Sequence, residues 1–174
     1  NKDGQPWTDR FDLFDAAFNI NGGFQQRAGE WAAKGQGEHH WAPVKGVYRV
    51  YQKVKRAYGG RMHRVCDIVR TTLIFKDLTG LTMALKAIED DPDVHILRVK
   101  NRYDPEYTSL DCYRDVALLV VGPDVTGGFV SEVQLNLESM YKAKSGGGHK
   151  RCELCMRFDH CVSYYRNSLT ESLA

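Results

Sequence analysis

The pattern of apolar and polar positions along the chain predicts an α/β (α+β) fold, a small mixed β-sheet covered by helices. Apolar residues recur at helical spacing in four stretches, which begin near Thr8, Val44, Leu78 and Leu137. Stretches rich in β-branched and apolar residues predict strands over residues 65–75, 94–99, 113–121 and 129–137. Glycines separate the last two strands, which we expect to form a hairpin.

Glycine and proline positions predict where these elements end. Asn21-Gly22-Gly23 is expected to break the first helix, and the polar, glycine-rich stretch 34–40 is expected to form a loop. Gly59-Gly60 is expected to end the second helix, and Asp91-Pro92 the third. In the second helix, a stripe at helical spacing predicts the buried face: Val47, Val50, Tyr51 and Val54.

Length and composition favour one globular domain over residues 1–174. The chain is 43% hydrophobic and 26% charged, which suits a single sizeable core. We expect a motif-bearing core over 43–150, an N-terminal helical extension over 1–42 and a C-terminal helical segment over 151–174. No apolar run is long enough to span a bilayer, so we expect a cytoplasmic protein without a membrane partner. The first residue is Asn1 rather than Met, which is compatible with a piece of a longer protein. Nothing in the sequence indicates the oligomeric state.

The five cysteines are an odd number in a domain large enough to need no disulfides, so we expect reduced thiols. Cys152 and Cys155 form a C-x-x-C pair, with His149, His160 and Cys161 nearby. This cluster could hold zinc, or its cysteines could be packing residues on one helix. The sequence leaves both interpretations open.

Positive charge is concentrated in one segment. The formal net charge is only +2, too small to indicate nucleic-acid binding by itself. Within residues 45–70, however, Asp67 is the only acid among eight basic residues: Lys45, Arg49, Lys53, Lys55, Arg56, Arg61, Arg64 and Arg70. Such a block is typical either of a site for a polyanion with a metal ion or of a solvated helix face.

Asp67 lies within the most apolar of the predicted strands. Alternation along that strand places it on the face of Thr71 and Leu73, with Arg70 on the other face. An ionised carboxylate buried there costs roughly several kcal/mol unless it is paired or bound to a metal. The two explanations are a metal ion and a cationic partner such as Arg70 or Arg102.

A second carboxylate belongs to a polar row on the last predicted strand. Glu132, Gln134 and Asn136 alternate with Val133 and Leu135, so one strand face is polar and the other apolar. The row is explained equally well by a solvated edge of the sheet or by a binding site.

Two carboxylates on one face of a sheet could share a magnesium ion, and Asp67 and Glu132 are the candidates. Magnesium accepts hard oxygen ligands and keeps waters for substrate phosphates. Phosphoryl and pyrophosphoryl transfer require a metal, cations for the phosphates and a group that orients the attacking hydroxyl. The chain also offers cations and an aromatic ring for a nucleotide: Arg70, Lys100, Arg102 and Tyr113.

Taken in order, these motifs resemble those of the RelA/SpoT-type (p)ppGpp synthetase domain, which has a nucleotidyltransferase-like fold. The motifs are the lysine- and tyrosine-rich stretch 45–53, then 67–70, 100–103, 112–115 and 132–135. The following stretch to Gly148-His149-Lys150 is similar to the helix and glycine–histidine run of that family. The resemblance spans residues 43–150 and identifies a divergent member.

The resemblance implies magnesium-dependent transfer of pyrophosphate from ATP to the 3′-hydroxyl of a guanine nucleotide, GDP or GTP. Asp67 would hold Mg²⁺, and Glu132 would complete the metal site or assist the acceptor hydroxyl. Tyr113 matches the tyrosine that stacks on the acceptor's guanine. Further residues would contact phosphates or line the nucleotide site: Lys45, Lys53, Arg70, Lys100 or Arg102, Arg114, Gln134 and His149.

The chain also departs from the family's pattern. Pro43 stands where the family has an arginine two residues before the lysine matched by Lys45, and Thr72 replaces the strand arginine. Arg70 shares a strand face with Thr72 and could still reach the site. Asn136 replaces the arginine that follows Glu-x-Gln-x.

These departures leave two alternatives. One is the same chemistry on another acceptor, an adenine nucleotide or a tRNA 3′ end, because the basic segment permits RNA without requiring it. The other is a catalytically silent nucleotide-binding or regulatory module.

Overall fold

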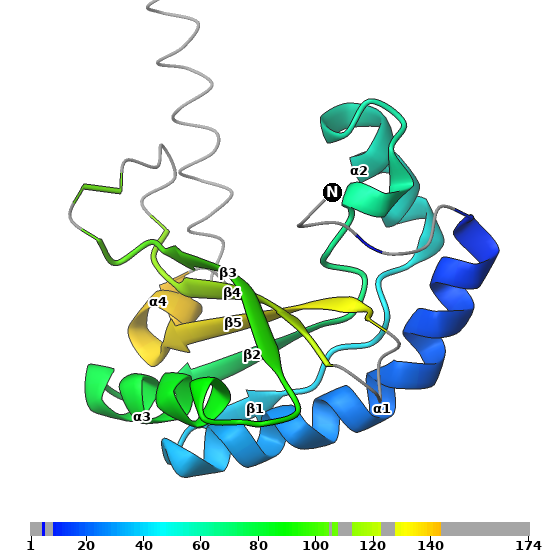
Figure 1. Cartoon of the computed structure of the whole chain (residues 1–174). Coiled ribbons are helices and arrows are strands. Elements are labelled where there is room, and N and C mark those ends of the chain that lie inside the picture. Colours follow the sequence, from blue (N-terminus) through cyan, green and yellow to red (C-terminus); the bar gives the residue numbers. More distant parts are fainter. Residues whose placement is uncertain (1–4, 6–8, 105, 108–112, 123–127, 144–174) are drawn as a thin grey trace, which may run out of the picture.

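A computed structural model of the chain describes residues 5, 9–104, 106–107, 113–122 and 128–143, which form one five-stranded mixed sheet with helices packed around it (Figure 1). The helices are α1 (Arg10–Lys34), α2 (Val47–Ala57), α3 (Leu78–Glu89) and α4 (Glu138–Ala143), with a 3-10 turn, η1, at Met62–Arg64. The strands are β1 (Glu38–His40), β2 (Arg70–Phe75), β3 (His95–Asn101), β4 (Val116–Val121) and β5 (Val130–Leu137). The predicted small mixed sheet covered by helices is confirmed.

The strands lie in the order β1-β2-β5-β4-β3. The central pair, β2 and β5, is parallel and all other pairs are antiparallel, including the predicted hairpin of β4 and β5. In the central pair, Arg70 lies beside Glu132 and Thr72 beside Gln134. Partners in register present their side chains to the same face, so these four residues define a polar face of the sheet, called here the open face.

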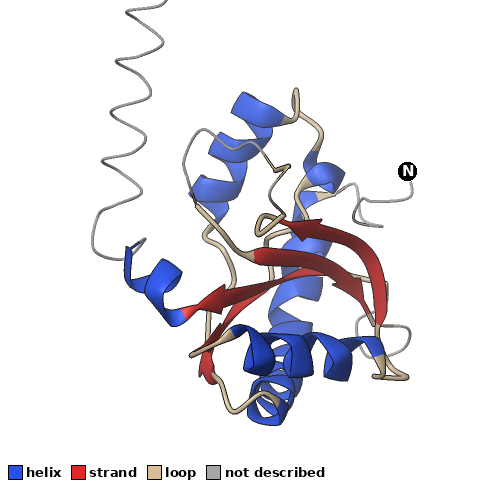
Figure 2. Cartoon of the chain, turned by 90° about the vertical axis from the view of Figure 1, so that its left-hand side faces the viewer, coloured by secondary structure: helices blue, strands red, loops and turns tan. Residues whose placement is uncertain are grey.

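Helices α1 and α3 cover the opposite face: α3 lies beneath the sheet in Figure 1, and α1 runs from below the sheet up along its right-hand side. Figure 2 shows helices below and behind the strands. Leu73, Val133 and Leu135 point toward these helices and are fully buried. They pack in one core cluster with apolar residues of both helices: Leu13, Ala17, Phe24, Ala28, Trp31, Leu81, Ala84 and Ile88. Burial of each large apolar side chain contributes about 1.5–3 kcal/mol, so this layer holds the sheet while leaving the open face to polar groups.

Helix α1 is longer than predicted. It starts after Asp9, whose side chain accepts a hydrogen bond from Phe11 N, and it runs through Gly22 and Gly23 to Lys34. The predicted break is wrong because the helix packs along its whole length, with Ile20 and Phe24 buried on either side of the glycines. Each glycine costs about 1 kcal/mol relative to alanine, which is less than the burial of either apolar side chain gains.

Strand β1 was not predicted, because its sequence, Glu38-His39-His40, has no apolar alternation. It is held by its backbone pairing to β2 and by His39, whose Nε2 lies 3.0 Å from Gln25 Oε1 of α1 and 2.9 Å from Thr71 Oγ1. Burial and the neighbouring His40 lower the pKa of His39. The histidine therefore serves here as a neutral packing and hydrogen-bonding residue.

Helix α2 buries a narrower stripe than predicted. Val50 and Val54 are buried, but Val47 and Tyr51 are 60% and 59% exposed. The helix packs on η1 and on the segment before β2. This contact is narrow, so it buries two of the four predicted side chains.

Two predicted strands begin later than expected. β2 starts at Arg70, so Val65, Ile68 and Val69 are buried in an extended segment that precedes the strand. β4 starts at Val116, so Tyr113 also precedes its strand. The alternation that we applied to residue 67 therefore does not hold there, because strand geometry begins only three residues later.

The C-terminal helical segment, His149 and the cysteine cluster at Cys152, Cys155 and Cys161 lie outside the described residues. Within the described part of the chain, no helix combines the length and apolar character needed to cross a membrane.

Candidate active site

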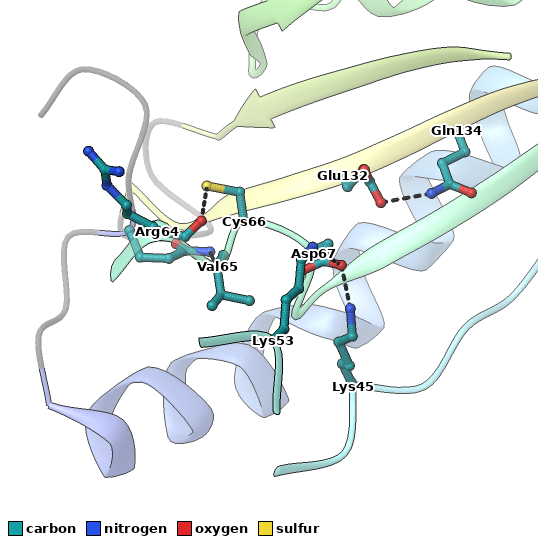
Figure 3. A network of polar contacts seen from close by, with 9 residues as sticks. Lys45, Lys53, Arg64, Val65, Cys66, Asp67, Glu132 and Gln134 are labelled. Atoms are coloured by element: carbon teal, nitrogen blue, oxygen red, sulfur yellow. Dashed lines mark hydrogen bonds and ion pairs between the residues drawn. The ribbon is translucent and has the colours of Figure 1, made fainter. Parts of the chain in front are cut away.

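Asp67 is the centre of a cluster of charged groups beside the open face (Figure 3). Its side chain is 12% exposed, and its Oδ2 accepts hydrogen bonds from Lys45 Nζ and, at 2.7 Å, from Lys53 Nζ. Lys53 comes from α2. Lys45 comes from the segment before that helix, and its backbone N–H donates to Ile68 O at 2.9 Å. The cationic partners of Asp67 are thus these two lysines, and the pairing with Arg70 or Arg102 that we considered is wrong.

The electrostatics of this cluster favour an ionised Asp67. Burial acts to raise the pKa of Asp67, but the hydrogen bonds and charges of Lys45 and Lys53 outweigh it, and the pKa is lowered. Burial acts to lower the pKa of Lys53, but Asp67 outweighs it and raises that pKa. Asp67 Oδ1 is buried and has no hydrogen-bond partner among the residues that the structure describes. One carboxylate oxygen is therefore neutralised, while the other lacks the partner that a buried oxygen requires.

Glu132 is the second carboxylate of the site and extends from β5. Gln134 Nε2 donates a hydrogen bond of 2.8 Å to Glu132 Oε2, which fixes the carboxylate along the strand. Burial, and next the negative charge of Asp67, raise the pKa of Glu132. The charge of Asp67 therefore acts on Glu132, and the two side chains belong to the same polar network (Figure 3).

This pair suits a magnesium ion. Asp67 Oδ1 and the Glu132 carboxylate are hard oxygen ligands, and Mg²⁺ in phosphate-transfer sites is commonly held by one or two carboxylates together with waters and substrate phosphates. Among the described residues, no group of three or more His, Cys, Asp and Glu side chains could hold a metal. Any ion here would therefore depend on this pair and on oxygens from a substrate.

Further cations lie on the open face across the sheet. Arg70 is in register with Glu132. On β3, Lys100 is in register with Ala117, which pairs with Gln134, and Arg98 occupies the corresponding position beside Leu119. Arg98 was not among the predicted site residues, although Lys100 was, and the two lie in an unbroken register two positions apart, so alternation from Lys100 would have placed Arg98 on the same face.

Arg102 already has a buried acidic partner. Its guanidinium forms an ion pair with Asp115, whose side chain is only 2% exposed. Lys100 instead is exposed, and its Nζ lies 5.2 Å from the centre of the Tyr107 ring. Of the two alternatives for a phosphate contact, the geometry favours Lys100.

Tyr113 lies next to this ion pair. Its hydroxyl donates a hydrogen bond of 2.5 Å to Asn136 Oδ1, and its backbone carbonyl accepts one of 3.1 Å from Arg114 Nη1. Burial, and then the charge of Asp115, raise the pKa of Tyr113. The phenol stays protonated and its hydroxyl is held from β5, so the ring has a defined position at the end of the open face.

Gln5 joins the two segments that carry the carboxylates. Its Nε2 donates to Val130 O at 2.7 Å and to Val65 O at 3.3 Å, and its Oε1 accepts from Val130 N at 2.8 Å. Val65 and Val130 each precede one of the two carboxylate residues by two positions. A single glutamine in a polar stretch has no sequence signature for such a role, so this residue was missed.

Comparison with known proteins agrees with this fold. No family model matches the chain, and no curated protein matches its sequence. A GTP pyrophosphokinase family protein from Streptococcus pneumoniae superimposes with a TM-score of 0.62 at 15% identity, over 94% of this chain and 93% of that one. The small alarmone synthetase 1 from Bacillus subtilis bound to its product pppGpp gives a TM-score of 0.63 at 14% identity, over 92% and 97% of the two chains. The same synthetase bound to AMPCPP gives 0.56 at 14% identity, again over 92% and 97%. The chain therefore has the alarmone synthetase fold, and the resemblance stated from sequence is confirmed at that level.

Proposed function

We propose that this protein is a magnesium-dependent pyrophosphokinase that transfers pyrophosphate from ATP to the 3′-hydroxyl of a guanine nucleotide. The observation that carries the proposal is the pair of hydrogen bonds that Lys45 and Lys53 donate to the buried Asp67. The effect of the Asp67 charge on the pKa of Glu132 supports a shared site for the two carboxylates. Structural neighbours include a synthetase bound to pppGpp and to AMPCPP, which supports nucleotides as the substrates.

Lys45 and Lys53 would hold the phosphates of the donor. A lysine ammonium has three N–H donors, so each lysine can keep its hydrogen bond to Asp67 Oδ2 and still donate to a phosphate oxygen. Asp67 Oδ1 and Glu132 would hold Mg²⁺, which supplies positive charge to the donor phosphates when bound. In this proposal the phosphates would lie beside the carboxylate pair.

Glu132 is suited to receive the proton of the acceptor hydroxyl. The carboxylate oxygen of Glu132 that is not bound to Mg²⁺ would accept this proton as a general base. The acceptor's 3′-oxygen would form a bond to the β-phosphorus of ATP while the bond from that phosphorus to the α,β-bridging oxygen breaks. The hydroxyl proton passes to Glu132, and the departing group is AMP.

The acceptor would lie at the β3–β4 side of the open face. The ring of Tyr113, with its hydroxyl held by Asn136, would stack on the acceptor's base, and Lys100 would contact its phosphates. Stacking does not read the hydrogen-bonding edge of a base, so the preference for guanine rests on the resemblance.

The decisive experiment measures AMP release from ATP in the presence of Mg²⁺ and, separately, GDP, GTP, ADP or tRNA. Release with GDP or GTP, and mass spectrometry of a pyrophosphorylated guanine nucleotide, would support the proposal. Release with ADP or tRNA alone would keep the chemistry and replace the acceptor. Nucleotide binding without AMP release under any condition would identify a silent module and overturn the catalytic proposal.

A further inference from the structure

His40 and Tyr141 form an aromatic pair on the open face that has no role in the proposed chemistry. Tyr141 Oη and His40 Nδ1 share a hydrogen bond of 3.0 Å, and the two rings meet edge to face with centres 4.9 Å apart. The pair joins β1 to α4, two elements at one edge of the sheet. The His40 side chain is 40% exposed and Tyr141 is half-buried, so ring surface remains available to a ligand.

The register of the sheet places this pair on the same face as the carboxylates. His39 points to α1, as its contact with Gln25 shows, so the next residue, His40, points to the opposite face. His40 pairs with Thr72, and Thr72 pairs with Gln134, whose amide bonds Glu132. An unbroken row therefore runs along the open face from the aromatic pair to the reaction centre.

A reaction between two nucleotides needs two surfaces for bases, one on each side of the phosphates. Tyr113 and Lys100 lie toward β3 and β4, on one side of Glu132. His40 and Tyr141 lie on the other side, beyond β2. Between the pair and Glu132, position 72 carries the small side chain of threonine, so no long side chain on β2 separates them in that row.

We propose that His40 and Tyr141 form the surface against which the adenine ring of the donor nucleoside triphosphate stacks. This inference rests on the proposed function and assigns the donor's base to one edge of the sheet. Neighbouring strands are about 4.8 Å apart, so His40 lies about 10 Å from Gln134, two strands away. A nucleoside triphosphate with its base over His40 can thus extend its phosphates toward Lys45, Lys53 and the carboxylates.

The test compares a ligand that has the base with one that lacks it. AMPCPP and inorganic triphosphate are titrated into the wild type and into the Tyr141→Ala, His40→Ala and Tyr141→Phe variants, with Mg²⁺ present, by calorimetry. Loss of a stacking partner is expected to raise the Kd for AMPCPP at least about five-fold in Tyr141→Ala and in His40→Ala. The Kd for triphosphate should stay within about two-fold of the wild type, because it has no base. Tyr141→Phe keeps the ring and should bind AMPCPP nearly as the wild type does.

The control variant is Phe18→Ala, which removes an aromatic ring that is 64% exposed on α1 and should change neither Kd. Unchanged AMPCPP affinity in both alanine variants would overturn the inference and leave the proposed function intact. Equal loss of AMPCPP and triphosphate would also overturn it, because the residues would then act only by supporting the fold. A wild type that binds neither ligand would overturn the inference together with the proposed function. A wild type that binds AMPCPP through Tyr141 but releases no AMP would support the base site and contradict only the catalytic proposal.

Discussion

Lys53 and Asp67 are joined by a hydrogen bond of 2.7 Å between Nζ and Oδ2, and Lys45 bonds the same oxygen. Two cations therefore converge on one oxygen of a buried carboxylate, and its other oxygen has no partner within the described part of the chain. With Glu132 nearby, the cluster contains two positive and two negative groups. The four charges sum to zero, so removing one of them should shift the pKa values of the other groups.

Asp67→Asn should abolish turnover while the fold remains. Asparagine keeps the shape of the side chain but removes the charge that a magnesium ion would require, so we expect the rate of AMP release to fall at least about 100-fold. Lys45 and Lys53 also lose their counter-charge, so a modest loss of stability should accompany the change. Circular dichroism and thermal melting would check the fold. Asp90→Asn is the matched control because the Asp90 side chain is 64% exposed and forms an ion pair with Lys86, one turn earlier in the chain. Full activity in Asp67→Asn would exclude the proposed metal site.

Glu132→Gln should remove activity and at the same time stabilise the protein at pH 7. The raised pKa of Glu132 means that its ionised form is disfavoured in the folded state, and glutamine removes that cost while its side-chain oxygen can still accept from Gln134. Each kcal/mol gained should raise the melting midpoint by about 2–4 °C in a chain of this size.

The pH dependence of this stabilisation follows from linkage. Above its folded-state pKa, Glu132 is ionised and opposes folding. Below its ordinary value of 4.5 it is protonated in both states, so the difference between wild type and Glu132→Gln should vanish near pH 4. Asp67 has a lowered pKa, below 3.8, and its ion pairs should persist at that pH. Urea unfolding at pH 7 and pH 4 would measure the effect, and an equal difference at both values would argue against a buried, charged Glu132.

Lys100→Met should weaken acceptor binding, whereas Arg102→Met should destabilise the fold. Lys100 is exposed, so its loss should change stability by less than about 0.5 kcal/mol but raise the Kd for the acceptor about 10-fold or more, because a charged hydrogen bond is lost. Arg102→Met leaves Asp115 buried without its partner, which should cost about 3–5 kcal/mol of unfolding free energy. Titration of GDP and denaturant unfolding would separate the two residues. A stable Arg102→Met variant with weakened GDP binding would reverse the assignment.

Local patterns predicted the parts of this structure that depend on neighbours in sequence. The alternation of Glu132 and Gln134 with Val133 and Leu135 correctly separated the two faces of β5, and apolar residues at helical spacing correctly predicted a helix that begins at Leu78. In both elements, one periodicity holds over the whole length of the segment. In β5, the apolar positions of the pattern are therefore the ones that are buried in the core.

Other features depend on contacts between distant segments, and local patterns missed them. The lysines that bond Asp67 lie 14 and 22 residues before it, and no periodicity links them to that carboxylate. β1 exists because the backbone of β2 offers it a partner. α1 continues through Gly22 because tertiary packing outweighs helix propensity.

Gly35→Ala and Gly22→Ala should change stability in opposite directions. A Cβ on Gly35 would lie 2.1 Å from the carbonyl oxygen of Gly80, where the end of α1 meets the start of α3. Because the obstacle is backbone, the helices would have to separate, at a cost of about 1–3 kcal/mol or more. A Cβ on Gly22 meets nothing within 4 Å, so alanine there should stabilise α1 by about 0.5–1 kcal/mol. Denaturant unfolding of both variants would measure this, and a stabilised Gly35→Ala would contradict the close helix contact.

The hydrogen bonds of Gln5 to Val65 and Val130 mean that the spacing between the two carboxylates is set partly from a residue far from both in sequence. Any engineered version of this domain that begins beyond residue 5 would keep every acidic and basic group of the site yet lose the tether between their supporting segments. Such a shortened version should still fold around α1 and α3, but its affinity for a divalent ion should fall. We therefore expect the choice of amino-terminal boundary to change the affinity for Mg²⁺, which titration of versions with and without residue 5 would measure.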